Sequence, residues 1–559
     1  MNNEMSSFAH AIMEQKYAHL KIDGSKETWP EIAYRVARNV LGAVPGNEGM
    51  VDITAKLIAE RKFIPGGRYL YASGRDFHQV QNCLLMRAED SREGWADHLQ
   101  KCAMALMTGA GIGIGYSDVR HRNSIIKRTG GFATGPIALM QMTNECGRGI
   151  MQGGSRRSAI WAGLKWWHKD IFEFIHLKDW SPEVIAMKEK DFNFPATMDG
   201  TNISVQLDPE FIKAYYNPDY VCTMYDPKDP EKFKHVTHEW AQRVYWETVR
   251  QMLSKAEPGF SFDHDDEILR NACTEVTSAD DSDICNLASI NMSRVSTLQE
   301  MRTLVEVGTR FLLAGTVYSD VPFDKVAEVR NKNRRLGLGL MGLHEWLLQR
   351  GYAYGPNDEL EQYLEIYASS TTIAAGIADE WGISRPVKTR AIAPTGTIGI
   401  MAETTTGIEP IFCVAYKRRW LNGLSWQFNY VLDPTAKRLI DSGIDPDSIE
   451  DAYTLAEQPE KRIAFQAWLQ TYVDHGISST LNLPPWGSEL NNDSTVKPFG
   501  DMLIGYLPKL RGMTCYPDGC RGGQPLTRVR YQTAIEYEGE IFIEAMDVCD
   551  LTKGGTCGS

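Results

Sequence analysis

Short apolar runs alternate with longer amphipathic stretches from about residue 80 onward, and this alternation constrains the fold more than any other feature. Runs such as NCLLM, GIGIGY and NISVQL have the length and apolar character of buried strands. Between them, DHLQKCAMALM and PIALMQMTNECGRGIM are typical of helices that pack on a sheet. The pattern predicts repeated βα units, and therefore an α/β protein with a mostly parallel sheet or barrel.

The two ends of the chain differ from this middle. Residues 1–62 have helical periodicity, which breaks at Pro65, Gly66 and Gly67. The last stretch, EAMDVCDLTKGGTCGS, is polar and rich in glycine, which is typical of a mobile tail. We find no low-complexity linker and no internal repeat. The sequence therefore predicts one large α/β body that follows an N-terminal helical segment.

Composition disfavours several classes of function. The net charge of −13 argues against broad binding to nucleic acid. No apolar run reaches about 18 residues, the length that a membrane-spanning helix needs. The N-terminus lacks the basic start and apolar core of a secretion signal, so we expect a cytoplasmic protein with reduced thiols. The eleven cysteines contain no C-x-x-C pair and no zinc-finger spacing, so we expect no metal site.

The segment RNACTEV places an amide, a thiol and a carboxylate at alternate positions, Asn271, Cys273 and Glu275. In extended backbone, alternate side chains point the same way, so the three groups would meet at one spot. The glutamate could act there as a general base. A nucleophilic cysteine needs a base such as histidine, and His264 is merely the nearest in sequence. From these residues alone, a solvated acidic loop remains the simpler interpretation.

Other segments surround this one in a definite order. The N-x-C-x-E loop lies between QNCLLM, which contains Cys83, and CNLASIN, which begins at Cys285. Further segments along the chain are GAGIGI, TGPIALM, QGGSRRSAIWAG, RRLGLGLMGLHE, APTGTIGIMAETTTGIEP and LRGMTCYPDGCRGGQPL. Taken together and in this order, they resemble the catalytic subunit of ribonucleotide reductases. The resemblance implies a ten-stranded α/β barrel of two parallel five-stranded halves, with a central finger loop near residues 271–275. We therefore expect an N-terminal helical region at 1–75, the barrel at 76–535, and a C-terminal segment with a redox-active tail at 536–559.

The resemblance also implies a role for each reactive group. Cys273 would carry a thiyl radical that takes the 3′ hydrogen of a ribose. Glu275 would accept the proton of the 3′ hydroxyl, and Asn271 would hold the ribose hydroxyls. Cys83 and Cys285 would supply two electrons and become a disulfide. Hydrogen-atom abstraction needs no histidine, so the absence of one beside Cys273 is no obstacle.

A turn rich in glycine and threonine, PTGTIG, follows a strand-like run and precedes a predicted helix. Small residues at such a turn let backbone N–H groups approach phosphate oxygens. In the family, the matching turn cradles the diphosphate of the ribonucleotide substrate. The substrate-binding residues that we expect are Asn82, Pro394, Thr395, Gly396, Thr397 and Ile398.

Three segments resemble the effector-binding region of the family. Asp90 matches the acidic residue that holds the effector's deoxyribose, and NSIIKRTGGFATG matches a first specificity loop with Lys127 and Arg128 facing phosphates. GGSRRSA matches a second loop, in which Arg156 and Arg157 can contact phosphate or base. The resemblance implies control of substrate choice by a deoxynucleoside triphosphate or ATP. It also implies a homodimer.

The family regenerates its active-site thiols with cysteines on a mobile C-terminal tail and a thioredoxin-like reductant. Cys549 and Cys557 are the matching pair in this chain. They are more widely spaced than the family's usual pair, so Cys515 and Cys520 remain an alternative.

The stretch TCYPDGCRGG indicates how the radical is made. Oxygen-dependent members of the family have two adjacent tyrosines there, whereas in this chain Tyr516 is followed by Pro517. The stretch resembles adenosylcobalamin-dependent members instead, so we expect adenosylcobalamin as the cofactor. Two alternatives are a large subunit that needs a separate radical-generating subunit, and a catalytically inactive nucleotide-binding homologue. The sequence leaves the choice between diphosphate and triphosphate substrates open, and it predicts neither a nucleic-acid nor a membrane partner.

Overall fold

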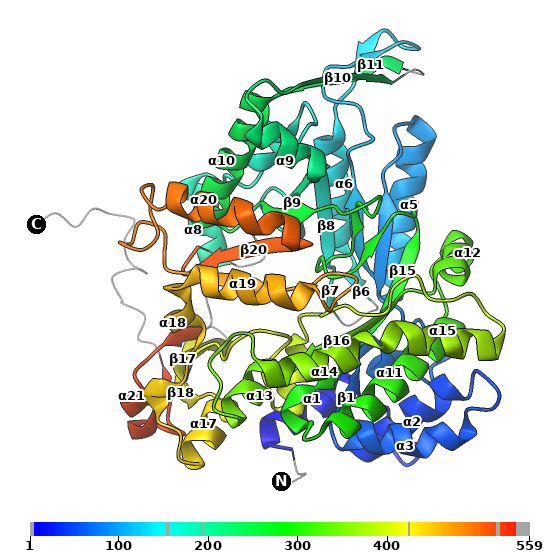
Figure 1. Ribbon diagram of the computed structural model, residues 1–559, viewed down its shortest axis with the longest axis vertical. Helices are drawn as coiled ribbons and strands as arrows, with labels where there is room; N and C mark the ends of the chain where they lie inside the picture. The colour runs from blue at the N-terminus through cyan, green and yellow to red at the C-terminus, as the bar shows by residue number, and fades with distance from the viewer. Residues whose placement is uncertain are drawn as a thin grey trace, which may run out of the picture.

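The computed structural model describes residues 5–152, 156–191, 194–226, 229–422, 425–520 and 526–543. Its centre is a ten-stranded sheet with the order β1-β15-β2-β3-β8-β9-β12-β20-β19, and β16 pairs with β15 (Figure 1). The strands are β1 (Phe63–Pro65), β2 (Cys83–Arg87), β3 (Gly111–Gly115), β8 (Ile160–Lys165), β9 (Thr201–Leu207), β12 (Gly259–Phe262), β15 (Asp283–Asn291), β16 (Leu336–Met341), β19 (Thr480–Leu483) and β20 (Gly512–Pro517).

Most of this sheet is parallel, which confirms the predicted α/β class. β2, β3, β8, β9 and β12 form one parallel run. β15 is parallel to β16, and β19 is parallel to β20. Antiparallel pairings of β2 with β15 and of β12 with β20 join these groups. Within the described part of the chain, the continuous ladder does not close on itself. There, β16 and β19 are linked through the segment at residues 390–392 by two isolated bridges, Leu338 with Arg390 and Ile392 with Ile477.

Helices cover the outside of the first parallel run because its strands are apolar on both faces. Leu84 and Met86 of β2 pack outward with helix residues such as Cys102 and Leu106, whereas Cys83 points the other way. The helices of this part are α5 (Arg92–Thr108), α6 (Pro136–Gly149), α7 (Ile171–Ile175), α8 (Pro182–Lys190), α9 (Pro209–Tyr216), α10 (His238–Lys255), α19 (Pro459–Gln470) and α20 (Val496–Tyr506).

A second apolar cluster lies between β15, β16 and the helices at the N-terminal end of the chain. The N-terminal segment is helical as predicted, and its amphipathic helix α2 (Trp29–Leu41) packs on α3 (Glu48–Ala59) and α11 (Leu298–Tyr318) (Figure 1). The other helices here are α1 (Ser7–Lys16), α4 (Gly67–Ala72), α12 (Asp324–Asn333), α13 (Leu343–Gln349), α14 (Asp358–Ala368), α15 (Ser370–Trp381) and α16 (Gly396–Ala402).

A small antiparallel sheet lies to one side of the large sheet, and its strand order is β21-β17-β18-β22 (Figure 1). The sequence analysis did not foresee it. β22 lies inside the segment that was expected to be tail. Its strands are β17 (Ala415–Asn422), β18 (Ser425–Leu432), β21 (Leu526–Arg528) and β22 (Ile541–Ile543), with α17 (Pro434–Asp441), α18 (Ala452–Ala456) and α21 (Tyr531–Glu536) beside them.

Four short hairpins complete the structure: β4 (Ile125–Ile126) with β5 (Gly131–Phe132), β6 (Met151–Gln152) with β7 (Arg156–Arg157), β10 (Val221–Asp226) with β11 (Asp229–Thr237), and β13 (Leu269–Arg270) with β14 (Thr277–Ser278). Within the described ranges, no helix is long and apolar enough to cross a membrane.

Candidate active site

One edge of the large sheet gathers the residues expected to be catalytic. The parallel strands β2, β3, β8, β9 and β12 all begin at this edge, and Cys83 is the first residue of β2. β15 and β20 are antiparallel to this run, so they and their parallel neighbours β16 and β19 run toward the same edge. We call it the active-site edge.

The two expected redox cysteines face each other across a strand pair. Cys83 of β2 lies directly opposite Cys285 of β15, and both thiols are buried and reduced. Directly opposed residues of antiparallel strands have neighbouring side chains, so a disulfide can form without a change of fold. Burial raises the pKa of both thiols well above the usual value, and the charge of Glu275 raises the pKa of each further. Both thiols are therefore protonated and can supply hydrogen as well as electrons.

The N-x-C-x-E segment forms the tip of the β13–β14 hairpin, which packs against the inner face of the sheet. Leu269 and Val276 of the hairpin belong to one small apolar cluster with Cys83 and Cys285. The backbone passes so close to β3 that a Cβ on Gly113 would lie 1.8 Å from the Arg270 carbonyl oxygen. Only glycine at this position allows the approach. We call β13, β14 and residues 271–276 the finger hairpin.

A tight turn presents the three groups at the fingertip. The Asn271 side chain accepts a hydrogen bond from the Val276 N–H at 3.0 Å, and the Thr274 N–H donates to the Asn271 carbonyl at 3.1 Å. Thr274 has a left-handed backbone with φ of 68°, which is uncommon for a residue with a branched side chain. Cys273, beside it, is half-buried. Backbone strain of this kind persists only where surrounding contacts hold the residue in place, and it is common at functional sites.

Glu275 is buried at the fingertip with the properties of a general base. Burial raises its pKa to about 7, although its own backbone N–H and the Asn271 side chain lower the pKa in part. Among the described residues, its Oε2 atom has no hydrogen-bond partner. A carboxylate that titrates near neutral pH and has an open acceptor can take up and return a proton. The interaction of both thiols with this charge places Glu275 near Cys83 and Cys285.

The expected phosphate cradle lies at the same edge. The segment that precedes it bridges in parallel to β16 and to Ile477, so it too runs toward the active-site edge. It ends at Thr395, which has φ of 52° and caps α16. The Thr395 hydroxyl accepts a hydrogen bond from the Gly407 N–H at 2.8 Å, which holds the turn. A Cβ on Gly396 would meet no atom within 4 Å, so the turn faces open space.

The backbone of Asn82 links Cys285 on β15 to the first residue of β3. Its N–H donates to the Cys285 carbonyl at 3.2 Å, and its carbonyl accepts from the Gly111 N–H at 2.8 Å. The structure thus brings Asn82, the two facing cysteines, the fingertip and the Thr395 turn to one edge.

Comparison with known proteins agrees with this arrangement. The family model described as "Ribonucleotide reductase, barrel domain" matches residues 81–258, 260–385 and 379–516. The chain belongs to the ribonucleotide reductase family. These matched ranges include the facing cysteines, the finger hairpin and the Thr395 turn. Members of this family are oxidoreductases.

Relatives within the ribonucleotide reductase family align over most of the chain. A vitamin B12-dependent ribonucleoside-diphosphate reductase of Thermoplasma acidophilum is 26% identical over 96% of this chain and 74% of its own length. The protein of the same name from Mycobacterium tuberculosis strain H37Rv is 26% identical over 94% of this chain and 79% of its own length. A protein of Mycobacterium phage D29 named "Putative adenosylcobalamin-dependent ribonucleoside-triphosphate reductase" is 24% identical, with 98% of both chains covered.

The residues expected to bind an effector in this reductase-family chain lie at two places. Asp90 follows the far end of β2 and forms an ion pair with Arg120 at 3.0 Å, and Arg120 precedes the loop that carries exposed Lys127 and Arg128. These groups lie away from the active-site edge. Arg157 belongs to β7, which pairs with β6.

The β6–β7 hairpin, by contrast, lies beside the fingertip. Gln152 on β6 approaches within 3.5 Å of a Cβ placed on Gly111, and Ala272 of the finger hairpin approaches within 3.3 Å of the same point. The backbone of Arg156 pairs with Gln152. Residues 153–155 of this loop are outside the described ranges. Of the two expected effector loops, the β6–β7 hairpin is therefore the one that lies close to the fingertip.

Several residues that shape the site were missed by sequence reasoning. Gly113 and Gly476 give the finger hairpin its room, and the Gly476 N–H donates to the Glu275 carbonyl at 2.7 Å. His475, Arg335 and Glu267 are buried around the base of the hairpin. A glycine in an apolar strand signals close backbone approach, but nothing in the sequence says which segment approaches.

The alternative shuttle pair is not suited to exchange with the active-site thiols. Cys515 of β20 is fully buried and packs in the outer apolar cluster with Leu481 and Met513. Burial raises its pKa well above the usual value, so the reactive thiolate is disfavoured. Cys549 and Cys557 are outside the described residues.

Proposed function

We propose that the chain is an adenosylcobalamin-dependent ribonucleotide reductase that converts ribonucleotides to 2′-deoxyribonucleotides by thiyl-radical chemistry. The observation that carries the proposal is the buried group made by Cys83 opposite Cys285 with the fingertip of Asn271, Cys273 and Glu275 against them. This group combines a hydrogen-atom carrier, a base that titrates near pH 7 and a two-electron donor. Ribose reduction requires all three.

In this mechanism each step uses a residue of the fingertip or the strand pair. The Cys273 thiyl takes the 3′ hydrogen of the ribose, while Glu275 takes the proton of the 3′ hydroxyl. The 2′ hydroxyl leaves as water with a proton from one thiol of the pair. Cys83 and Cys285 together provide two hydrogens and become a disulfide, after which Cys273 returns the 3′ hydrogen. The balance is one ribonucleotide and two thiols to one deoxyribonucleotide, one disulfide and one water.

The parallel directions of the strands support a closed barrel. The segment at Arg390 and Ile392 is bridged in parallel to β16 on one side and to Ile477, just before β19, on the other. Counting this segment and leaving out the short edge strand β1, five strands run in each direction, and the two halves meet at the β2–β15 and β12–β20 pairings. We infer a ten-stranded barrel with the finger hairpin inside it, which would shield the radical from solvent.

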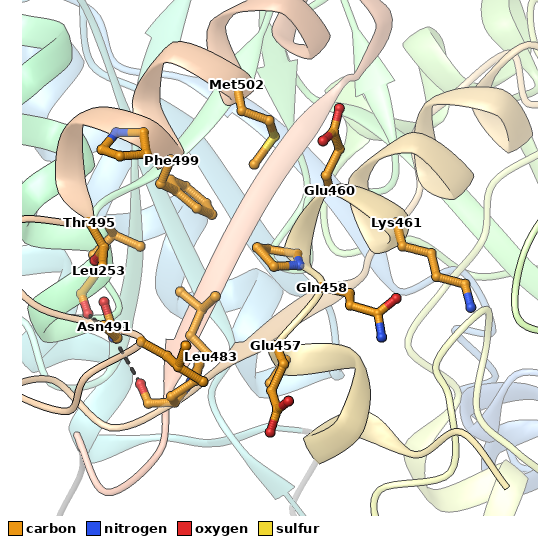
Figure 2. Close-up of a pocket in the computed structure, with 15 residues that line it drawn as sticks. Leu253, Glu457, Gln458, Glu460, Lys461, Leu483, Asn491, Thr495, Phe499 and Met502 are labelled. Carbon is orange, nitrogen blue, oxygen red and sulfur yellow. Dashed lines mark hydrogen bonds between the residues drawn. The ribbon is translucent and has the colours of Figure 1, made fainter. Parts of the chain in front are cut away.

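Adenosylcobalamin supplies an organic radical when its cobalt–carbon bond breaks. A groove of about 580 Å³ at the ends of β19 and α20 has the chemistry to hold one side of a corrin, because it combines an apolar floor with amide and carboxylate groups (Figure 2). β19 ends at the active-site edge, so this groove lies at the same edge of the sheet as the fingertip, on the outer, helix-covered face. Phe499 and Met502 point toward the middle of the groove, and Gln458 could hold amide groups (Figure 2). The Asn491 amide shapes the groove instead, because it donates to the Leu253 and Pro484 carbonyls.

The relatives support this cofactor. Those named as vitamin B12-dependent or adenosylcobalamin-dependent align over 94% or more of the chain. A ribonucleoside-diphosphate reductase large subunit of Plasmodium falciparum aligns over 62%. The absence of a Tyr-Tyr pair at Tyr516 of β20 agrees with a radical that does not arrive from a second subunit.

The groove is tested by binding of hydroxocobalamin, followed by absorbance. Leu490→Glu places a charge on the exposed rim of the groove, and Leu20→Glu does the same at a comparably exposed leucine of the N-terminal segment. We expect at least tenfold weaker binding in the first variant and unchanged binding in the second. Equal binding of hydroxocobalamin by both variants would show that the cofactor does not bind in this groove.

The function is tested by assaying the purified chain anaerobically with a ribonucleotide, a dithiol and adenosylcobalamin. We expect deoxyribonucleotide from diphosphates, triphosphates or both, and none from Cys273→Ser. Product that forms only after a second subunit is added would favour the large-subunit alternative. Full turnover by Cys273→Ser would remove the radical assignment.

We propose further that Asp90, Lys127 and Arg128 bind a nucleoside triphosphate effector at an interface between two copies of the chain. Exposed methionines along α5, α6 and β6 support a homodimer through these elements, because exposed apolar side chains favour association: Met104, Met107, Met142 and Met151. Cys549 and Cys557 remain the proposed shuttle, re-reduced by a thioredoxin-like protein. Sedimentation with and without dATP tests the dimer.

A further inference from the structure

A set of buried charges surrounds the base of the finger hairpin, opposite the fingertip. Arg335, the residue before β16, is almost fully buried and bridges two carboxylates. Its Nη1 lies 2.8 Å from Glu267, which precedes the hairpin, and its Nε lies 2.5 Å from Asp283, which begins β15. One guanidinium therefore connects the segment that enters the hairpin with the strand that leaves it.

Each residue of β14 donates a side-chain hydrogen bond to one of these two carboxylates. The Thr277 hydroxyl donates to Glu267 at 2.6 Å, and the Ser278 hydroxyl donates to Asp283 at 2.6 Å. The Asn333 amide adds a third donor to Asp283 at 2.8 Å. We call Glu267, Thr277, Ser278, Asp283 and Arg335 the hairpin anchor. It joins β14 to fixed points on both sides.

A second set of contacts extends from the anchor to the catalytic glutamate. Lys388 forms an ion pair with Glu267. The Thr277 N–H donates to His475 Nδ1 at 3.1 Å, and the next residue along from His475, Gly476, donates its N–H to the Glu275 carbonyl. Burial keeps His475 neutral by lowering its pKa well below the usual value, which Arg335 and Lys388 lower further. A neutral imidazole is required here, because Nδ1 acts as an acceptor.

The finger hairpin depends on these contacts because its own ladder is minimal. β13 and β14 pair at only two positions, Leu269 with Ser278 and Arg270 with Thr277. A two-stranded hairpin of that size has no independent stability in water. The anchor also acts on the redox pair, because Asp283 lies two residues before Cys285 on β15. A shift of β14 relative to β15 would change the spacing between fingertip and cysteine pair.

We propose that Arg335 is a positioning residue for catalysis, which sets the finger hairpin against β15 so that Cys273 and Glu275 meet the Cys83–Cys285 pair. The inference rests on the proposed function for its effect on turnover, but the geometry that it predicts can be measured without turnover. A lysine at position 335 keeps the positive charge but lacks the planar fork, so it can serve one carboxylate and not both.

The experiment compares Arg335→Lys with Arg35→Lys. Arg35 is also largely buried, in the N-terminal segment away from the site, where it pairs with one carboxylate, Glu27, at 2.8 Å and donates to backbone carbonyls. Amide hydrogen exchange is followed at Val276, Thr277 and Gly476, whose N–H groups are hydrogen-bonded in the anchored hairpin. We expect at least tenfold faster exchange at these amides in Arg335→Lys and no change in Arg35→Lys. Unchanged exchange in both variants would overturn the proposal.

Turnover provides the second readout. For Arg335→Lys we expect kcat to fall at least tenfold with KM within twofold, and the acid limb of kcat/KM to move to lower pH as water reaches Glu275. Besides Cys273 on the same fingertip, which carries the radical in the proposed reaction, the thiols of Cys83 and Cys285 face Glu275, and they set no acid limb because they are protonated there. If Arg335→Lys lost only as much thermal stability as Arg35→Lys and its pH profile did not move, the anchor would have a structural role alone.

A milder variant covers the case in which Arg335→Lys does not fold. Thr277→Val removes only the hydroxyl that donates to Glu267 and keeps the side-chain shape. For Thr277→Val we expect about threefold faster amide exchange and a fall of about threefold in kcat. If a folded Thr277→Val shows neither change, the positioning role of the anchor is wrong. Inactive wild-type chain would refute the proposed function, whereas the exchange result would still decide the positioning.

Discussion

Two antiparallel hairpins of this molecule are held in opposite ways. The β17–β18 hairpin pairs at eight positions and has β21 and β22 as further neighbours. The finger hairpin pairs at two positions, yet most of its residues are buried. The first is stabilised by its own ladder, and the second by contacts with β3, β15 and the segment at Gly476. A reactive loop that must keep one geometry is thus supported by its surroundings rather than by its own pairing.

Among substitutions in the two hairpins, we expect the largest loss of activity from a change at Glu275 of the fingertip. Glu275→Gln removes the base but keeps the shape, so we expect kcat/KM to fall by roughly 10²–10⁴-fold. The wild-type profile should show an acid limb near pH 7, because burial raises the pKa of Glu275 to about 7. Steady-state rates from pH 5 to pH 9 measure both. A wild-type limb near pH 4.5 would show that Glu275 is hydrated during turnover.

Gly113→Ala tests whether the finger hairpin depends on its neighbours. The added Cβ would lie 1.8 Å from the Arg270 carbonyl oxygen, so the hairpin must move away from β3. We expect kcat to fall by about 10²-fold, the cost of a small misplacement, and the free energy of unfolding to fall by about 1–3 kcal/mol. Denaturant unfolding and the reductase assay measure the two effects.

Gly376→Ala is the matched control for this change. Gly376 lies in α15, and a Cβ there would meet no atom within 4 Å. It should stabilise the protein by up to about 1 kcal/mol through helix propensity, with activity unchanged. Wild-type rates in Gly113→Ala would mean that the hairpin tolerates displacement and that the comparison above fails.

In the wild type, stability and activity should depend on pH in opposite directions at Glu275. Ionisation of this carboxyl allows it to act as a base, but it destabilises the fold. A carboxyl whose pKa rises on folding from 4.5 to about 7 stabilises the fold fully below pH 4.5, and this contribution is lost as pH rises through 7. We therefore expect the glutamine variant to be more stable than wild type by up to about 3 kcal/mol at pH 8, and by under about 1 kcal/mol at pH 5. Chemical denaturation at the two pH values tests the sign.

The smallest catalytic effect is expected in the β17–β18 hairpin. Phe428 stacks on Phe542 of β22 with ring centroids 5.1 Å apart, and the Lys417 ammonium lies 3.8 Å from its ring centroid. Phe428→Ala should lower stability by roughly 1–3 kcal/mol while kcat at saturating substrate stays within twofold. Thermal unfolding and the reductase assay check this. A large loss of kcat would mean that the side sheet takes part in catalysis.

The sequence predicted the α/β class and the fingertip because both are local patterns. Short apolar runs between amphipathic stretches specify βα units, and Asn271, Cys273 and Glu275 are adjacent enough to be found together. The small sheet of β17, β18, β21 and β22 escaped prediction. Its strands come from distant parts of the chain, and residues 526–528 and 541–543 are too short to give a strand pattern on their own.

Cysteine spacing shows the same limit. Cys515 and Cys520 are close in sequence, yet β20 directs Cys515 into the outer apolar layer. Cys83 and Cys285 are far apart in sequence, yet the β2–β15 ladder sets them face to face. The family resemblance identified that pair, and the register of the ladder explains it.

By itself the sequence determined the chemical groups available to this protein: a thiol with an amide and a carboxylate beside it, two further thiols and a glycine-rich turn. Tertiary structure decided which of these groups meet, and it decided their protonation. Arg335 is one of many arginines in the sequence, and only folding places it between Glu267 and Asp283 at the base of the hairpin. The physical reason is burial. Segments that are distant in the chain exclude water from Glu275, and this raises its pKa.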